Sequence, residues 1–219
     1  VYQNRFIYGD DEAMILRNVY LRDWRHLPRL VSAQNLEGSG LSCRFYRPLQ
    51  MLLYFLIVQI FGVVPAPFQA LNIGLHATAS VLAFFLLRRW AKSDFFCAAL
   101  AALWSLHPMH VEAVANINGT ADPLWLACGL AAFYFHLRER FAAAAALMFL
   151  AFLSKEAAVS LPALFLAHEW ILGKRHWRPH RPYWAALLAY LALHHAAVDM
   201  GKTMNFATLY GQGAHALSR

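Results

Sequence analysis

The chain has 219 residues, of which 60% are hydrophobic and only 14% charged, with a mean hydropathy of +0.40. Soluble domains carry about 25% charged and about 45–50% apolar residues, so this composition excludes an ordinary globular domain and indicates several membrane-spanning helices. The balance is basic, with 19 Lys and Arg against 12 Asp and Glu. We attribute the excess to loops beside anionic lipid. We expect no nucleic-acid partner, because the sequence contains no basic module interleaved with aromatic residues.

Three cysteines, Cys43, Cys97 and Cys128, follow no metal-ligand spacing. Two of them lie inside apolar runs, so we expect small core residues. The chain begins at VYQNRF, which is not a signal peptide, and stops at HALSR. Neither end resembles a natural terminus, and we expect a fragment that lacks at least one helix before it and a further region after it.

Apolar runs set the predicted helices, because a bilayer core needs about 20 apolar residues per crossing, with a range of about 17–25. Residues 1–47 are polar, with a helix-compatible patch over DEAMILRNVYLRDW and a turn at EGSG. Residues 48–64 are apolar, but the run is short and carries Gln50 and Gln59. Six further runs predict membrane-spanning helices over 68–90, 95 to about 106, about 121–137, 141–153, 157–172 and 183 to about 198.

Positive charge in the loops predicts which ends of these helices share a side. The segments RRWAK, RER and GKRHWRPHR hold 9 of the 19 basic residues and fall at alternate ends of the predicted spans. The positive-inside rule therefore makes all three cytoplasmic. The polar stretch over 105–125 and the SKE triplet over 154–156 then lie together on the outer side.

The side on which residues 1–47 lie depends on whether the run over 48–64 crosses the membrane. A crossing would make residues 1–47 cytoplasmic, which their seven arginines favour. A helix along the membrane surface would leave them outside, which the short length and the two glutamines favour. Charge alone favours the cytoplasm.

The stretch SLHPMHVEAVANINGTADPLW gathers polar groups between two apolar runs. Ionisable groups at membrane depth are costly and generally mark function. Glu112 follows His107-Pro108, where proline is expected to break the helix, and it is a candidate functional acid. Asp122 is either a second such acid or a solvated residue that caps a helix beginning at Pro123.

Two histidines in this stretch, His107 and His110, are three residues apart and could face one ligand. Paired histidines on a helix can bind zinc. No further His or Cys lies near them in the sequence, so satisfied polar side chains are expected instead. Asn118 begins an NGT triplet, which fits a glycosylation sequon, although such triplets are common by chance.

The SKE triplet, Ser154 to Glu156, interrupts an apolar run over 141–172. One helix of that length would measure about 48 Å at 1.5 Å per residue, too long for one crossing, so the chain is expected to turn near Lys155. Lys155 and Glu156 either pair with each other in an ordinary turn or hold charge at the outer interface. There the lysine could meet a lipid phosphate.

Two further polar sites lie in the N-terminal segment. YGDDEAMIL carries three consecutive acids, Asp10, Asp11 and Glu12, which indicate either a helix start or a functional cluster. Arg47, in FYRPL, is either a snorkelling anchor or a phosphate contact. The sequence has no glycine-rich phosphate loop, βαβ pattern or nucleophile elbow, so no nucleotide-sugar-binding domain is predicted.

The order of these pieces resembles a known family. An acidic pair, YRPL, a helix ending LLRRW, HPMHVEAVANINGTADPLW and FLSKEAAVSLPALFL follow one another over nearly the whole chain. This is similar to membrane glycosyltransferases with C-terminal TPR repeats, a branch of the protein O-mannosyltransferase-like (family 39-like) group with the GT-C fold. Their typical strings are close to DD, YRPL, HPxHxEAVA…GRADLL and SKE. The chain departs at NGTAD, where the family often has an arginine in place of Thr120.

The resemblance implies an all-α fold, a polytopic membrane helix bundle in one domain with a long outer first loop. Residues 1–67 would form that loop, with amphipathic and membrane-surface helices. Residues 68–200 would form about six transmembrane helices, and residues 201–219 would begin another outer loop. The run over 48–64 would then lie along the membrane surface, which overturns the preference from charge alone. All four polar clusters would share one outer cavity.

The resemblance also implies an inverting transfer of a hexose, such as mannose, from a polyprenyl or dolichyl phosphate to a hydroxyl of a protein or glycan. No cofactor or metal site is expected. Asp10, or alternatively Asp11, would take the proton from the acceptor hydroxyl. Lys155 and Arg47 would stabilise the leaving phosphate, and Glu112 would orient the acceptor or the base. Substrate-binding roles extend to His110, Asp122 and Glu156.

Such an enzyme would be an integral, multi-pass protein of the bacterial inner membrane facing the periplasm, or of the ER membrane facing the lumen. Its partners would be membrane lipid, the lipid-linked donor and the acceptor. Two other classes stay open. One is a transporter or flippase for a lipid-linked substrate, which would often show internal repeats that are not visible here. The other is a non-catalytic membrane scaffold for a TPR domain.

Overall fold

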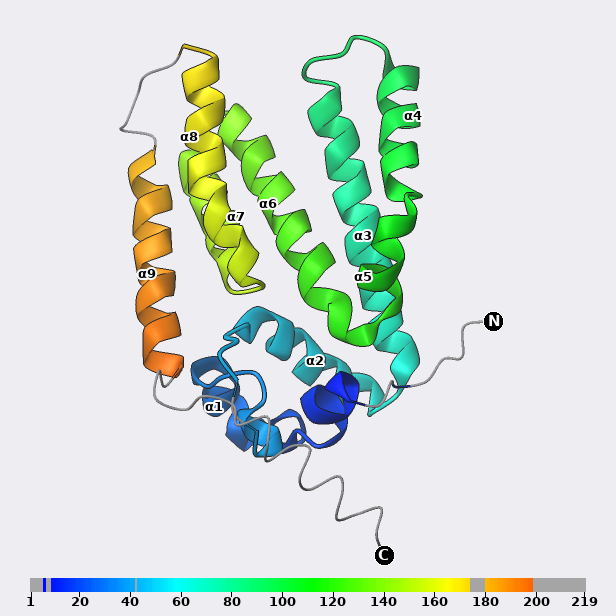
Figure 1. Cartoon of the computed structure of the whole chain (residues 1–219), viewed down its shortest axis with the longest axis vertical. Coiled ribbons are helices and arrows are strands. Elements are labelled where there is room, and N and C mark those ends of the chain that lie inside the picture. Colours follow the sequence, from blue (N-terminus) through cyan, green and yellow to red (C-terminus); the bar gives the residue numbers. More distant parts are fainter. Residues whose placement is uncertain (1–5, 7–8, 42, 174–179, 199–219) are drawn as a thin grey trace, which may run out of the picture.

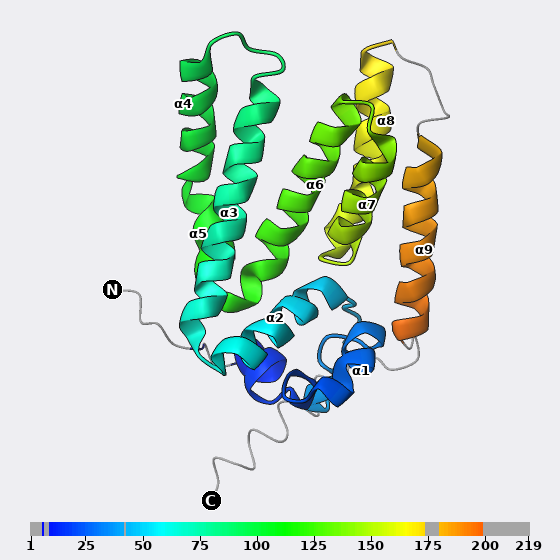
Figure 2. The ribbon, with the colours of Figure 1, turned by 180° about the vertical axis from the view of Figure 1, so that it is seen from behind.

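The computed structural model describes residues 6, 9–41, 43–173 and 180–198, and their regular structure is entirely helical. The prediction of an all-α fold is confirmed for this part of the chain. Six helices run along the long axis, and a transverse layer of helices and turns crosses at one end of them (Figure 1; Figure 2 gives the view from behind). The six are α3 (Pro65–Leu87), α4 (Asp94–Ser105), α6 (Ala121–Leu137), α7 (Phe141–Phe152), α8 (Leu161–Ile171) and α9 (Arg181–Ala197).

Each of the six apolar runs found in the sequence forms one of these helices. Among the residues that the structure describes, α3 is the one helix that is both long and apolar enough to cross a membrane by length and composition. The helices α4 and α7 are apolar but shorter, as is α2 (Pro48–Phe61) in the transverse layer. Proline stands in the first turn of α2, α3, α8 and α9, where its missing N–H is not needed.

The chain breaks its helix between α4 and α6, as the sequence predicts at His107-Pro108. The side chain of His107 accepts a hydrogen bond from the backbone N–H of Met109 and starts a single turn, η5 (Pro108–His110). A short helix, α5 (Val111–Ala115), and a 3₁₀ turn, η6 (Ile117–Thr120), follow before α6 begins. The polar stretch therefore forms an irregular segment between two long helices.

The helix-compatible patch over residues 11–24 forms three separate helical turns and no continuous helix. They are η1 (Glu12–Leu16), η2 (Val19–Leu21) and η3 (Trp24–His26). The side chain of Asn18 accepts from the N–H of Tyr20, and that of Asp23 from the N–H of Arg25. Such local bonds compete with a continuous helix. The EGSG turn is confirmed, with Gly40 in the left-handed region at φ 77°.

The transverse layer also contains α1 (Leu27–Ser32) and α2. It has its own hydrophobic core. Ile15 and Leu21 from the turns, Phe55 from α2 and Phe68 from α3 are fully buried together. A second core joins α6, α7, α8 and α9 through small and large apolar side chains. This burial holds the acidic N-terminal turn against the ends of the long helices.

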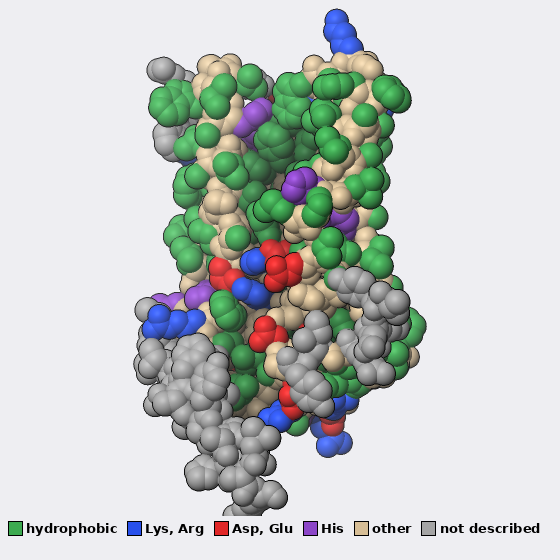
Figure 3. All heavy atoms as spheres, turned by 45° about the vertical axis from the view of Figure 1, so that its right-hand side comes forward, with side chains coloured by type: hydrophobic (Ala, Val, Ile, Leu, Met, Phe, Trp, Pro, Cys, Tyr) green, Lys and Arg blue, Asp and Glu red, His purple; other side chains and the backbone are tan. Residues whose placement is uncertain are grey.

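The outward faces of the long helices are apolar. Phe95, Leu106 and Ile171 are 82–85% exposed, and hydrophobic side chains cover the bundle in Figure 3. Acidic and basic side chains gather instead at the level where the bundle meets the transverse layer (Figure 3). An extended apolar surface of this kind marks contact with lipid or another protein.

A buried polar cluster attaches the broken segment to α2 and α3. Asn72 of α3 donates from its side chain to the carbonyl of Asn116 (2.8 Å), and Tyr54 of α2 donates from its hydroxyl to the carbonyl of Ile117 (2.6 Å). The hydroxyl of Thr120 lies within hydrogen-bond distance of both side chains. Tyr54, Asn72 and Thr120 are fully buried, so this cluster fixes the segment to the transverse layer.

Gly119 lies where the broken segment folds back on itself. A Cβ there would stand 2.8 Å from the carbonyl oxygen of Ala113, so we expect Gly119→Ala to lower the free energy of unfolding by about 1–3 kcal/mol. Gly74→Ala is the matched control, because its Cβ would meet open space on α3. We expect that change to stabilise the protein by at most about 1 kcal/mol. Thermal unfolding in detergent measures both, and equal stability of the two variants would contradict the close approach.

Candidate active site

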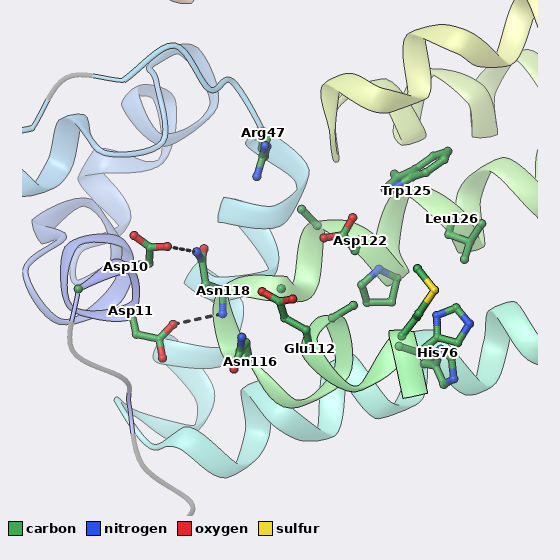
Figure 4. A pocket seen from close by; sticks show the side chains of 17 residues that line it. Asp10, Asp11, Arg47, His76, Glu112, Asn116, Asn118, Asp122, Trp125 and Leu126 are labelled. Atoms are coloured by element: carbon green, nitrogen blue, oxygen red, sulfur yellow. Dashed lines mark hydrogen bonds between the residues drawn. The ribbon is translucent and has the colours of Figure 1, made fainter. Parts of the chain in front are cut away.

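A cavity of about 730 Å³ opens between the N-terminal turn, the broken segment and the start of α6. Its lining also includes Arg47, which stands just before α2, and His76 of α3. Figure 4 shows these side chains arranged around one space. Six of the eight site residues predicted from the sequence line this cavity directly: Asp10, Asp11, Arg47, His110, Glu112 and Asp122.

The other two predicted residues, Lys155 and Glu156, reach the same place through ion pairs. The guanidinium of Arg47 bonds both carboxylate oxygens of Glu156, from Nε at 3.2 and 3.0 Å and from Nη2 at 2.8 Å. Lys155 Nζ pairs with a carboxylate oxygen of Asp122. The structure thus gathers residues from four distant parts of the sequence, while their roles stay predictions.

These partners contradict one interpretation of the SKE triplet, an ordinary turn in which Lys155 and Glu156 pair with each other. Lys155 and Glu156 do not pair with each other, and each pairs with a residue of another element. The suggestion that Asp122 caps a helix is wrong, because α6 begins at Ala121, one residue before it, after Thr120 and without a side-chain cap. Asp122 lies instead in the first turn, where a carboxylate is favoured by the helix dipole.

The two N-terminal aspartates differ in their surroundings. Asp11 is only 3% exposed, and its Oδ1 accepts a hydrogen bond from the backbone N–H of Asn118 (3.2 Å). Asp10 is exposed to the cavity, and its Oδ2 accepts from the side-chain amide of Asn118 (3.0 Å). Glu112 is also exposed there, and no described residue forms an ion pair with it. Asp10 and Glu112 therefore present the accessible carboxylates.

Rings lie beside the carboxylates at the α3 side of the cavity. The ring centroid of Trp104 lies 5.5 Å from that of His76 and 4.5 Å from that of His110. His76 Nε2 lies 3.0 Å from the carbonyl oxygen of Ser105. The imidazole of His110 can form a hydrogen bond with a hydroxyl.

The idea that His107 and His110 face one ligand does not fit the geometry. Their ring centroids are 6.3 Å apart, and His107 caps η5 while only His110 lines the cavity. Within the described ranges, no three His, Cys, Asp or Glu side chains are arranged to hold a metal ion.

Sequence reasoning missed several lining residues, above all His76, Asn116, Asn118 and Trp125. A signal for His76 was present, because Asn72 and His76 stand one turn apart inside an apolar run and so share a helix face. Asn118 was interpreted as a sequon, whereas its side-chain amide donates to Asp10.

Comparison with curated proteins finds relatives that share one description. The chain is 33% identical over 138 residues to protein O-mannosyl-transferase Tmtc1 of Drosophila melanogaster, which is 61% of this chain and 16% of that protein. It is 32% identical over 135 residues to protein O-mannosyl-transferase TMTC1 of Mus musculus (59% and 14%). It is 30% identical over 149 residues to protein O-mannosyl-transferase F38B6.6 of Caenorhabditis elegans (62% and 20%). No family model and no solved structure matches the chain.

These relatives confirm the resemblance to the protein O-mannosyltransferase-like group that the sequence motifs indicated. The chain is homologous to proteins of that name over about 60% of its length. It spans 14–20% of the length of these three relatives.

The bidentate pair between Arg47 and Glu156 is expected to stabilise the fold. Their side chains are 16% and 31% exposed, so alanine substitutions, singly and together, should give a coupling free energy of about 1.5–3 kcal/mol. Arg88 and Asp94 form a matched control pair with side chains 45% and 65% exposed, for which we expect at most about 1 kcal/mol. Denaturant unfolding of both double-mutant cycles measures the two values, and equal coupling would argue against a special role for the cavity pair.

Proposed function

We propose that the chain is the catalytic membrane domain of a glycosyltransferase. It transfers a hexose, mannose by analogy with the names of its relatives, from a polyprenyl or dolichyl phosphate to a hydroxyl of a protein or glycan. The observation that carries this proposal is the cavity itself. It places two accessible carboxylates beside two cations, the set that transfer from a lipid phosphate needs.

The outer surface supports a multi-pass membrane protein. The exposed side chains of the long helices are largely apolar, and α3 alone meets the length of a full crossing among the described helices. The shorter α4 continues through η5 and α5, and α8 is preceded by η7 (Glu156–Ser160). Broken helices are tolerated in a membrane where the irregular backbone lines a polar cavity. We therefore treat α4–α5 and η7–α8 as two-part crossings.

Orientation follows from the basic loops. RRWAK and RER follow the ends of α3 and α6 that lie farthest from the transverse layer, and the positive-inside rule makes that end cytoplasmic. The cavity then opens to the periplasm or to the ER lumen. The 14 residues of α2 span about 21 Å, less than a bilayer core of about 30 Å. The helix also lies across the ends of the long helices (Figure 1), and this orientation supports α2 as a membrane-surface helix.

The reaction is a single displacement with inversion. Asp10 takes the proton of the acceptor hydroxyl as the hydroxyl oxygen bonds to the anomeric carbon. The bond from that carbon to the donor phosphate breaks, and its electron pair leaves with the polyprenyl phosphate. The transition state resembles an oxocarbenium ion. Glu112 orients the acceptor or the sugar, because it faces the same cavity without a cation partner among the described residues.

Arg47 and Lys155 stabilise the leaving phosphate. Both cations are held in place by carboxylates before any donor binds, so little reorganisation is needed at the moment of transfer. Asp122 and Glu156 keep the cations oriented, and the donor phosphate adds a further anionic partner on their cavity side. Trp125 and His110 line the remaining wall, where a ring face and an imidazole suit a sugar.

Asp10→Asn is expected to lower kcat for transfer from a polyprenyl-phosphate sugar by about 10²–10⁴-fold, because the general base is lost. Radiolabelled sugar transfer in membranes that contain the full-length protein measures this, with nucleotide sugars as a donor control. Asp94→Asn, at the far end of α4, is the matched variant and should retain activity. Transfer that persists when Asp10 and Asp11 are both asparagine would remove the general-base role.

Lys155→Gln is expected to raise the KM for the lipid-linked donor by about 10-fold or more, since a charge-assisted hydrogen bond to phosphate is lost. The KM for the acceptor should change little. Lys92→Gln removes an exposed lysine in the loop at the opposite end of the bundle and serves as the control. An unchanged donor KM would contradict phosphate binding at Lys155.

A further inference from the structure

Asn118 contacts both neighbouring aspartates of the cavity, although it stands 107 and 108 positions from them in the sequence. Its backbone N–H donates to Asp11 and its side-chain amide nitrogen donates to Asp10. A carboxylate only accepts hydrogen bonds, so the orientation of the amide group is determined. One residue thus sets the positions of the buried and the exposed acid together.

Hydrogen bonds from α2 fix the backbone at Asn118. Its carbonyl accepts a hydrogen bond from Gln50 Nε2 (3.3 Å), and the carbonyl of Ile117 before it accepts from the hydroxyl of Tyr54 (2.6 Å). Gly119 after it passes too close to Ala113 to admit a side chain. The amide of Asn118 therefore points at Asp10 from a backbone with little freedom to move.

The chemistry of this contact suits a general base. Asp122 and Glu156 each pair with a cation, so their carboxylates are already engaged. Asp10 has no ion-pair partner among the described residues, and its side chain accepts a hydrogen bond from the neutral amide of Asn118. Asn118 fixes one carboxylate oxygen of Asp10, and the other oxygen takes no hydrogen bond from a described residue, so it is free to accept a proton.

The contact between Asn118 and Asp10 also bears on whether the NGT triplet is a glycosylation site. A glycosylated asparagine must present its side-chain nitrogen to solvent outside the fold. The nitrogen of Asn118 instead donates inside the cavity, and Thr120 of the triplet is fully buried beside Tyr54 and Asn72. The triplet is therefore part of the site and not an acceptor for a glycan.

We propose that Asn118 is a positioning residue for catalysis, which orients the Asp10 carboxylate towards the acceptor hydroxyl. This role rests on the proposed glycosyl transfer. It adds to that proposal a residue that acts through Asp10 and does not itself touch the reacting atoms.

Asn118→Asp tests this role, since it keeps the shape of the side chain and places a second carboxylate against Asp10. Like charges at this separation disfavour ionisation. The acidic limb of the pH profile of kcat/KM should therefore move to higher pH by about one unit or more. Asn118→Ala should lower kcat by about 10-fold or more, with the KM for the lipid-linked donor little changed. Both are measured with the full-length protein in membranes.

Gln59→Ala is the matched control, because it removes a side-chain amide that donates to the carbonyl of Leu21, outside the cavity lining. It should leave kcat and the pH profile as in the wild type. Two results would overturn the role of Asn118 alone, provided that the wild type is active. One is an unchanged pH profile for Asn118→Asp, and the other is full kcat for Asn118→Ala. A glycan on Asn118 in the intact mass would overturn it as well. Absence of transfer by the wild type would overturn the proposed function and this role with it.

Discussion

Hydrogen bonds from α2 and α3 to three consecutive carbonyls, those of Asn116, Ile117 and Asn118, are the constraint on which the cavity depends. Their donors, the side chains of Gln50, Tyr54 and Asn72, are fully buried. A buried polar group without its partner costs about 1–3 kcal/mol, so moving the segment away from these donors would be unfavourable. That arrangement joins the transverse layer to the long helices and brings the N-terminal acids to the broken segment.

Ion pairing provides the second connection between the two parts of the molecule. Lys155 has an extended backbone, at φ −158° and ψ 142°, and successive side chains of an extended chain point to opposite sides. Lys155 therefore meets Asp122 at the start of α6, while Glu156 meets Arg47 at the start of α2. These two adjacent residues thus neutralise two charges at the cavity and position the starts of two helices. Asp10 and Glu112 are exposed cavity acids for which no described residue provides an ion pair.

Local sequence signals predicted what depends on local physics. Apolar runs placed the long helices, because burial or lipid contact requires them, and Pro108 placed the break after α4. The helix-compatible patch over 11–24 does not form one continuous helix, because side-chain bonds of Asn18 and Asp23 compete with it. The ion pairs that Lys155 and Glu156 form join residues 33 and 109 positions apart. No spacing rule within one element could reveal these pairs. Asn118 was missed for the same reason.

The departure at Thr120 now has a physical account. The family that the chain resembles often has an arginine there, whereas in this chain the Thr120 hydroxyl is fully buried within hydrogen-bond distance of Asn72 and Tyr54. A guanidinium at that point would lose its hydration among neutral groups, which costs far more than burying a hydroxyl. The position therefore serves here to hold the loop and supplies no charge. Positive charge near the cavity must then come from Arg47 and Lys155, both already oriented by carboxylates. The buried hydrogen bonds fix the loop that contacts Asp10 and Asp11. The two ion pairs fix Arg47 and Lys155. Together they keep acids and cations at the same cavity.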